Sequence, residues 1–285
     1  MPTIAYLGPE HTNTHLAAQK RFGRRARYIH APTVDDVFRF VERGQANFGV
    51  VPIENSLEGA VTHTLDRFAE KASSVRIVGE VEFSIQHYLI VKPGTVPAAV
   101  QRVYSHPQAL AQCRKWIAGH LATRCALEER SSTAEAVELV ASKATEWGIE
   151  TAEQVIAEAA IGSREAAQKF QLAARPIRVK GDNKTRFLML GRQKPKPGRF
   201  NKTSVLFGVK DRPGALYDAL IPFKQHRINL TKIESRPSKR KAWEYLFFID
   251  LEGHISEPRV KRALQALGRS TSLLRVLGSY PISGR

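Results

Sequence analysis

The sequence predicts an α/β protein of two parts, a large region of alternating strands and helices and a smaller βαββαβ module. In the first part, short β-branched or apolar runs alternate with stretches whose apolar residues recur at helical spacing, a pattern typical of mostly parallel sheets. A stretch rich in Pro, Gly and Lys then breaks this alternation. We therefore expect one domain over 1–191, a linker over 192–201 and a second domain over 202–285.

The first elements of the large region follow one another closely. A strand is expected over 3–9, and a helix follows it over 12–22. A second strand is expected over 46–53, and Leu65 and Phe68 then lie on one face of a helix. Each of these strands leads directly into a helix, as in a βαβ unit.

The same alternation continues into the second half of the large region. A strand over 101–107 precedes a helix with an apolar face, and a further helix is expected over 131–141. That helix opens with Ser132 and Glu135, which are spaced as in a capping box. The polar segment 142–157 is expected to extend it along the surface.

The last part of the chain has its own regular order. The predicted elements are a strand, a helix, two strands, a helix and a strand, over 203–209, 214–225, 228–235, 242–252, 257–267 and 273–281. This βαββαβ order is that of a ferredoxin-like domain.

Composition excludes several classes of protein. With 42% hydrophobic and 25% charged residues the chain is expected to be globular, and no apolar run reaches the ~20 residues of a membrane span. The N-terminus lacks the pattern of a signal peptide, and only Cys113 and Cys125 are present, so we expect a cytoplasmic protein. The net charge of +17 comes without a nucleic-acid-binding motif, so we expect neither nucleic acid nor membrane as a partner.

Small polar residues gather where strands are expected to end and helices to begin, at 8–12, 55–56, 105–108, 131–133 and 162–163. Singly, each is an ordinary helix cap. Together they favour a cleft for an anion, because helix N-termini at the carboxyl ends of strands present free N–H groups. Metal-ligand spacing and phosphate-binding glycine motifs are both absent from the sequence, so no metal and no cofactor are expected.

Several motifs, in order, resemble one known family. They are VVPIENSLEGAVTHTLDRF, SIQHYLIV, YSHPQALAQC, SSTAEA, AAIGS and NKTRFLML, followed by RPGALYDALIPFKQHRINLTKIESRPS. The first six are similar to those of prephenate dehydratase, and the last is similar to its regulatory ACT domain. The resemblance implies a two-lobed, periplasmic-binding-protein-like catalytic domain plus a ferredoxin-like ACT domain. No chorismate mutase region precedes the motifs, so the likeness is to the monofunctional enzyme.

The resemblance also implies a reaction and its site. Prephenate would lose carbon dioxide and water to give phenylpyruvate in phenylalanine synthesis, a lyase reaction without a cofactor. Thr185 would be the catalytic acid. The residues carried over as substrate-binding or as flanking the site are Thr12, Glu54, Asn55, Ser56, Ser84, Ser105, His106, Gln108, Ser132, Thr133, Asn183 and Arg186. His87 and Cys113 also match motif positions, but we expect them to be structural.

Arg186 leaves two alternatives open. On a strand over 185–190, Thr185 and Phe187 share one face. Arg186 then lies on the other face, away from the expected cleft. It could clamp substrate, because alternation is loose near a strand end, or it could form a structural ion pair.

The ACT resemblance implies regulation by phenylalanine. The residues expected to bind this effector are Gly214, Ala215, Leu216, Asn229, Leu230, Glu234, Ser235 and Arg236. In the family such sites form between the ACT domains of two subunits, so a homodimer or homotetramer is implied. Phenylalanine would favour a less active state by binding it more tightly.

Two places depart from the family pattern. The family usually has Gly-Thr-Phe after GPE, where this chain has His11, Thr12 and Asn13, and its usual acidic residue is replaced by Val179, with Asp182 nearby. Arogenate dehydratase activity and a non-catalytic phenylalanine-sensing or solute-binding protein remain alternatives. Prephenate decarboxylase is less favoured, because those relatives lack both the threonine and the ACT domain.

Overall fold

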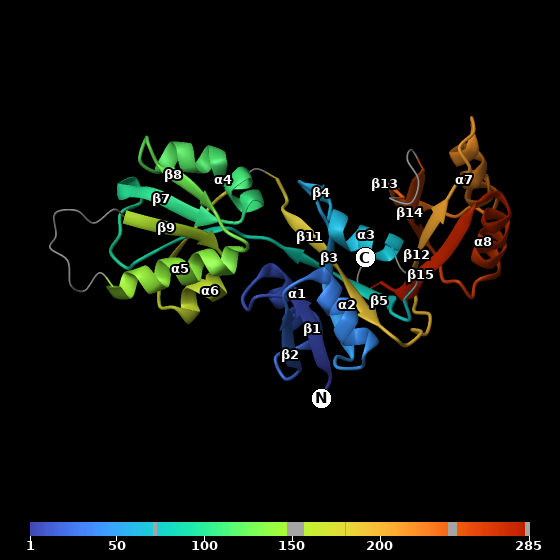
Figure 1. The fold of residues 1–285 in the computed structure, drawn as a ribbon, viewed down its shortest axis with the longest axis horizontal. Helices are drawn as coiled ribbons and strands as arrows, with labels where there is room; N and C mark the ends of the chain where they lie inside the picture. The colour runs from blue at the N-terminus through green and yellow to red at the C-terminus, as the bar shows by residue number, and fades with distance from the viewer. Residues whose placement is uncertain (71–72, 147–156, 180, 239–243, 283–285) are drawn as a thin grey trace. The chain divides into compact units, whose positions relative to one another are not determined.

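The computed structural model describes residues 1–70, 73–146, 157–179, 181–238 and 244–282 (Figure 1). The chain forms two compact units, each built from separate stretches. Unit 1 contains Met1–Leu7, Arg21–Glu82 and Thr185–Arg285, and unit 2 contains Gly8–Lys20 and Phe83–Lys184. The C-terminal module thus belongs to the same compact unit as the N-terminal strands. The domain boundaries expected from the sequence, at 191 and 202, stay a prediction.

Unit 1 is built on a ten-stranded sheet in the order β13-β14-β12-β15-β5-β11-β3-β1-β2, with β4 paired to β3. The strands are β1 (Thr3–Leu7), β2 (Arg27–Ala31), β3 (Phe48–Asn55), β4 (Gly59–Ala60), β5 (Arg76–Ser84), β11 (Lys184–Gly191), β12 (Asn201–Gly208), β13 (Leu230–Pro237), β14 (Tyr245–Glu252) and β15 (Leu273–Pro281). β1 is parallel to both β2 and β3, whereas β11 runs antiparallel to β3.

Helices α2 (Val34–Glu42) and α3 (Thr62–Glu70) supply apolar side chains to the core of this sheet. The same core takes in Leu206, Phe248 and Tyr280 of the C-terminal module. A separate core lies under α7 (Ala215–Gln225) and α8 (Pro258–Ser270), which cover one side of the module's strands (Figure 1). The predicted βαββαβ order, from β12 to β15, is confirmed.

Unit 2 is built on a five-stranded sheet in the order β10-β6-β9-β7-β8. These strands are β6 (Tyr88–Val91), β7 (Val100–Ser105), β8 (Ala126–Glu129), β9 (Ala157–Gly162) and β10 (Ala173–Pro176). Helix α4 (Pro107–His120) packs into one apolar cluster, and α5 (Thr133–Glu146) and α6 (Arg164–Lys169) pack into another. Two remaining helices are α1 (Asn13–Phe22) and the short 3-10 helix η1 (Pro97–Ala99). The predicted α/β class is confirmed.

The capping box expected at the start of α5 forms in a modified way. The N–H of Glu135 donates to Ser132 Oγ at 3.1 Å, as predicted. The Glu135 carboxylate, however, accepts from the N–H of Ser131 at 3.1 Å, one residue earlier than the motif requires. Most of the polar segment expected to extend this helix, residues 147–156, lies outside the described part of the chain.

One glycine makes possible the contact between the C-terminal module and the N-terminal strands. Gly278 of β15 pairs with Ile77 of β5, and a Cβ at Gly278 would lie 2.1 Å from the Ile77 carbonyl oxygen. That distance is far below any van der Waals contact, so the two backbones approach this closely only because residue 278 has no side chain.

We predict that Gly278→Ala lowers the free energy of unfolding by about 2–3 kcal/mol, because the added methyl group forces the two strands apart. Urea denaturation would measure it. Gly268→Ala in α8 is the control: its Cβ would make an ordinary 3.4 Å contact, and alanine favours a helix by about 0.5–1 kcal/mol. Equal stability of the Gly278 variant and the unaltered protein would contradict the prediction.

Candidate active site

Thr185 and Asn55 form a hydrogen-bonded pair across two neighbouring strands of unit 1. They face one another in the register of β11 and β3, and the Asn55 side-chain amide donates to Thr185 Oγ at 2.9 Å. Only 9% of Thr185 and 7% of Asn55 is exposed. The hydroxyl therefore lies in a largely dehydrated setting, where hydrogen bonds are stronger than in water.

The orientation of Asn55 is fixed by the turn that follows β3. Its Oδ1 accepts from the N–H of Leu57 at 2.9 Å and from the N–H of Glu58 at 3.1 Å. An Asx turn of this kind uses the carbonyl end of the amide and directs the NH₂ end to Thr185. The Thr185 hydroxyl thus acts as an acceptor toward Asn55, and its proton stays available to a ligand.

The neighbouring pair of the same ladder points to the opposite face of the sheet. Arg186 lies across from Glu54, and Arg186 Nε donates to Glu54 at 2.6 Å. Alternation along a strand sends consecutive side chains to opposite faces. The separation of Arg186 from Thr185 that the sequence predicted is therefore present, although the register shifts directly after Arg186.

Each of the three nitrogens of the Arg186 guanidinium pairs with a different carboxylate. Besides Glu54, Nη1 donates to Glu80 at 2.8 Å and Nη2 donates to Asp250 of β14 at 2.8 Å. Lys202 reaches Glu80 at 2.7 Å, and Lys232 of β13 pairs with Glu54. Three cations and three carboxylates thus form one balanced group, which we call the ion cluster.

The ion cluster changes the acid–base properties of its members. Burial alone would raise the pKa of Glu54, but Arg186 and Lys232 together hold it below its usual value. Burial would lower the pKa of Arg186, and the nearby carboxylates, Asp250 and Glu80 foremost, raise it instead. Glu54 and Arg186 are therefore both charged near neutral pH.

This arrangement corrects the substrate-binding roles expected for Arg186 and Glu54. The guanidinium is enclosed by carboxylates on the face opposite Thr185, and both Glu54 oxygens already accept from cations. The structure favours the second alternative for Arg186, a structural ion pair, because burying it without these partners would be very costly.

In unit 2, Asn183 joins a small polar group with α4 and the start of β6. Its side-chain amide donates to Gln112 Oε1 at 2.8 Å, and His87 Nε2 lies 2.7 Å from the same oxygen. Burial lowers the pKa of His87, so its imidazole is neutral near pH 7. Its buried contacts are those of a structural histidine, and that role stays a prediction. Gln112 was missed from sequence, although it lies one helical turn beyond Gln108, on the same side of α4.

The start of α4 holds two further expected residues. His106 is its N-cap, with Nδ1 accepting from the N–H of Gln108 at 3.3 Å, and the Gln108 side chain is exposed. Ser105 is instead fully buried, and its hydroxyl donates to the Ile161 carbonyl at 2.7 Å. The binding role expected for Ser105 is therefore not supported, because its hydroxyl links two strands inside the sheet.

The other expected polar residues lie at ends of elements. Ser132 caps α5, and Thr133 is its first residue. Ser84 is the exposed last residue of β5, and Ser56 is exposed in the turn after β3. None of these positions is tested by a bound ligand, so their substrate-binding roles stay predictions.

The altered N-terminal motif of unit 2 has an unusual backbone. His11 has φ of 63°, in the left-handed region that favours glycine, which explains why the family usually has glycine there. Its carbonyl accepts from Ser163 at 2.9 Å and its N–H donates to His15 Nδ1 at 3.0 Å. Thr12 Oγ donates to the Pro9 carbonyl at 3.0 Å, so this threonine ties the turn together.

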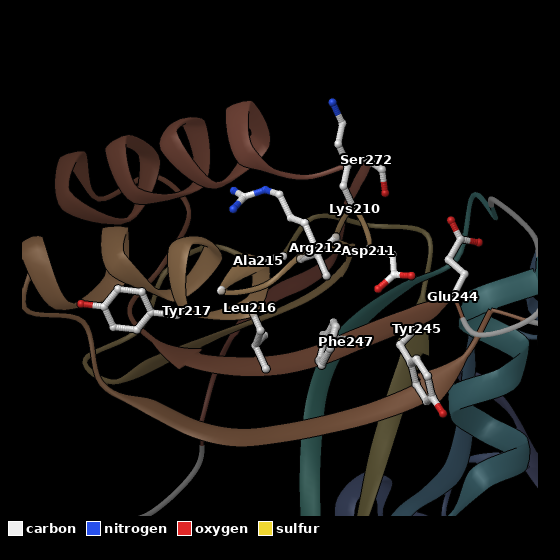
Figure 2. Close-up of a pocket in the computed structure, with 12 residues that line it drawn as sticks. Lys210, Asp211, Arg212, Ala215, Leu216, Tyr217, Glu244, Tyr245, Phe247 and Ser272 are labelled. Carbon is white, nitrogen blue, oxygen red and sulfur yellow. The ribbon is translucent and has the colours of Figure 1, made fainter.

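A pocket of about 620 Å³ opens in the C-terminal module beside the start of α7 (Figure 2). Gly214, Ala215 and Leu216 line it, together with residues 209–212 and the start of β14. Gly214 has φ of 76° and precedes α7 as its N-cap. Three of the residues expected to bind phenylalanine thus surround one concave site.

The other five residues expected at that site do not line this pocket. Leu230, Glu234, Ser235 and Arg236 lie on β13, and Asn229 directly precedes it. Ser235 is on the exposed face of the strand, whereas Arg236 faces inward and pairs with Asp66 of α3 at 3.1 Å. Within one chain, the residues expected to bind phenylalanine therefore form two groups, one at the pocket and one on or next to β13.

Comparison with known families decides what these sites belong to. The prephenate dehydratase model matches residues 4–195, and the ACT domain model matches residues 203–269. The chain belongs to the prephenate dehydratase family. Membership gives the lyase class, and the C-terminal module is an ACT domain, as the sequence predicted.

Relatives agree over almost the whole chain. A bifunctional chorismate mutase/prephenate dehydratase of Aquifex aeolicus is 48% identical over 280 residues, which are 98% of this chain and 73% of the relative. A prephenate dehydratase of Mycolicibacterium vanbaalenii is 35% identical over 99% of this chain and 91% of its own length.

Two solved structures extend the likeness to three dimensions. A prephenate dehydratase of Arthrobacter aurescens in complex with L-Phe has a TM-score of 0.84 at 34% identity, covering 98% of this chain and 89% of its own. A protein named as a novel type of quorum-quenching acylase has a TM-score of 0.80 at 30% identity, covering 99% and 98%. No helix within the described ranges is both long enough and apolar enough to cross a membrane.

We predict that Arg186→Met lowers the free energy of unfolding by about 3–5 kcal/mol, because buried Asp250 loses its cation and Glu54 and Glu80 each lose one of two. Denaturant titration at pH 7 would measure the loss. Arg39→Met is the matched control: Arg39 pairs with Asp36 at 2.8 Å, but its side chain is 52% exposed, so the cost should stay below about 1 kcal/mol. Similar losses in the two variants would contradict the prediction.

Proposed function

We propose that this chain converts prephenate to phenylpyruvate, with Thr185 as the proton donor. The observation that carries the proposal is the direction of the bond between Asn55 and Thr185. Asn55 donates to Thr185 Oγ, so the hydroxyl keeps its own proton for a leaving group. A donor is needed because hydroxide is a poor leaving group.

In the proposed step two bonds of prephenate break. The bond between the ring and its carboxylate breaks to release carbon dioxide, and its electron pair enters the ring. At the far side of the ring the carbon–oxygen bond breaks, and the departing oxygen takes the Thr185 proton and leaves as water. The Asn55 N–H stabilises the negative charge that develops on Thr185 Oγ, and solvent later returns the proton.

Substrate positioning is proposed for the polar residues at the ends of elements. Gln108 and Ser132 are the most suitable side chains at the helix starts of unit 2, because amides and hydroxyls there bind carboxylates. Asn183, which directly precedes β11, is the third. The Asn183 side-chain amide is hydrogen-bonded to Gln112 and lies close to His87 Nε2, and these contacts restrict its rotation. Thr12, Ser56, Ser84, His106 and Thr133 complete the proposed binding set.

The similarity to an acylase raises a nucleophilic role for Thr185 as the alternative. A nucleophilic hydroxyl needs a base that accepts its proton. Within the described part of unit 1, Thr185 has an amide donor as its partner and no histidine or carboxylate that accepts from it. The arrangement therefore favours an acid over a nucleophile.

Arogenate dehydratase activity is the other alternative. The same two bonds at the ring would break in arogenate, so parallel assays with prephenate and arogenate would show which one is the substrate.

Regulation is proposed to arise between two copies of the chain. Strand β13 is at the end of the sheet order, with Ile233 49% exposed, so its free edge suits pairing with a second copy. Such pairing could bring the β13 residues of one copy to the Gly214–Leu216 pocket of the other. We propose a homodimer or homotetramer in the cytoplasm, inhibited by phenylalanine at this shared site.

We predict that Thr185→Ala lowers kcat for phenylpyruvate formation by ~10²-fold or more, the scale expected for loss of a general acid. Absorbance of phenylpyruvate after addition of prephenate would measure it. Thr185→Ser is the control, because serine keeps a hydroxyl that Asn55 can hold. A near-normal rate in the alanine variant would reject the role of Thr185.

We also predict that phenylalanine inhibits the enzyme and that Ser235→Ala weakens this inhibition by about tenfold, through loss of one hydrogen bond to the ligand. Inhibition curves at fixed prephenate would measure the change. Thr231→Ala is the matched control, since it removes a hydroxyl from the same exposed face of β13. Equal inhibition of all three proteins would place phenylalanine binding elsewhere.

A further inference from the structure

One face of β13 is tied to the strands that carry the catalytic threonine. Lys232 pairs with Glu54 of β3, and four residues further along the same face Arg236 pairs with Asp66 of α3. The β13 strand also carries Leu230, Glu234 and Ser235, the residues expected at the phenylalanine site. Ser235 is on the exposed face of this strand, whereas Glu234 and Arg236 share the face of Lys232, so one strand carries both expected effector-binding residues and the contacts to β3 and α3.

Glu54 is placed where it can control the geometry of Thr185. It directly precedes Asn55 in β3, and it faces Arg186, which directly follows Thr185 in β11. The pair 54–186 is thus adjacent in the ladder to the pair 55–185. Immediately beyond it the register shifts. A register shift leaves a residue unpaired and loosens the ladder, so side-chain contacts at this point hold the strands in place.

Lys232 is the second cation that pairs with the Glu54 carboxylate. One Glu54 oxygen accepts from Arg186 Nε, and the other accepts from Lys232 Nζ. The Lys232 side chain is 12% exposed, and the Glu54 side chain is 33% exposed. The Arg186 and Lys232 side chains are thus held at fixed distances from Glu54 by its two oxygens. Without Lys232, a partly exposed carboxylate keeps one partner and can turn toward solvent.

We propose that Lys232, on the ACT domain, is a positioning residue for Thr185. Lys232 fixes Glu54, and Glu54 fixes the end of β3, where Asn55 orients the Thr185 hydroxyl. Lys232 contacts no reacting atom and acts only through these two residues. The inference rests on the proposed function and adds to it the route by which the regulatory strand reaches the catalytic side chain.

The first test is the kinetics of Lys232→Met with prephenate. We expect kcat to fall about tenfold, because small displacements of a catalytic group have large effects on rate, while KM changes less than about twofold. Lys232→Arg should restore kcat to within about threefold of the original value, since a guanidinium keeps the charge and the donor. Glu54→Gln should lower kcat as Lys232→Met does, and it decides the question if the methionine variant does not fold.

Lys202→Met is the matched control. Lys202 has the same 12% exposure and belongs to the same ion cluster, but it pairs with Glu80 and not with Glu54. Its removal should leave kcat within about threefold, the range expected when the catalytic group is not displaced. Equal losses of kcat in the Lys202 and Lys232 variants would overturn the proposal, since loss of any cluster charge would then suffice.

A second measurement needs no activity. The N–H groups of Leu57 and Glu58 donate to Asn55 Oδ1, so their hydrogen exchange reports on the orientation of Asn55. Lys232→Met should speed this exchange at least about fivefold, and Lys202→Met should not, because local opening follows loss of the specific support. Unchanged exchange in the Lys232 variant overturns the proposal even if prephenate is not the substrate. Failure of the unaltered protein to form phenylpyruvate would instead reject the proposed function.

Discussion

The buried guanidinium of Arg186 is the constraint on which the rest of unit 1 depends. An isolated buried cation is too costly to keep, so three carboxylates from β3, β5 and β14 must converge on it. Those strands come from stretches that are far apart in the sequence, and one charge brings them together. Thr185, the proposed proton donor, is the residue before Arg186, so its place follows from the same requirement.

Two adjacent residues of β11 thereby serve opposite purposes. Thr185 faces Asn55 on one side of the sheet, and Arg186 faces the ion cluster on the other. The period of two along a strand makes this division possible without any loop. The hydroxyl proposed to donate a proton and the structural charge stay on separate faces, because neither side chain can rotate through the sheet.

Much of this could be predicted from the sequence, for identifiable reasons. Apolar periodicity gave the βαββαβ order, and strand alternation placed Arg186 away from Thr185. The partners of Arg186 could not be predicted, because Glu80 and Asp250 lie far from it in the chain and no local pattern links them. Gln112 was missed since its role depends on Asn183, which approaches α4 only in the folded unit. Ser105 resembled a ligand residue in sequence, yet its strand end is buried.

The order of strands in unit 1 also has a consequence for biosynthesis. β11 lies between β5 and β3, and β15 pairs with β5, so the N-terminal strands gain these neighbours only after much of the chain has been made. Contacts between residues so distant in sequence form slowly. A nascent chain that ends before residue 184 would leave β3 without β11, with the N–H and C=O groups of that edge unpaired, so the N-terminal strands would be open to pairing with other chains until synthesis is complete.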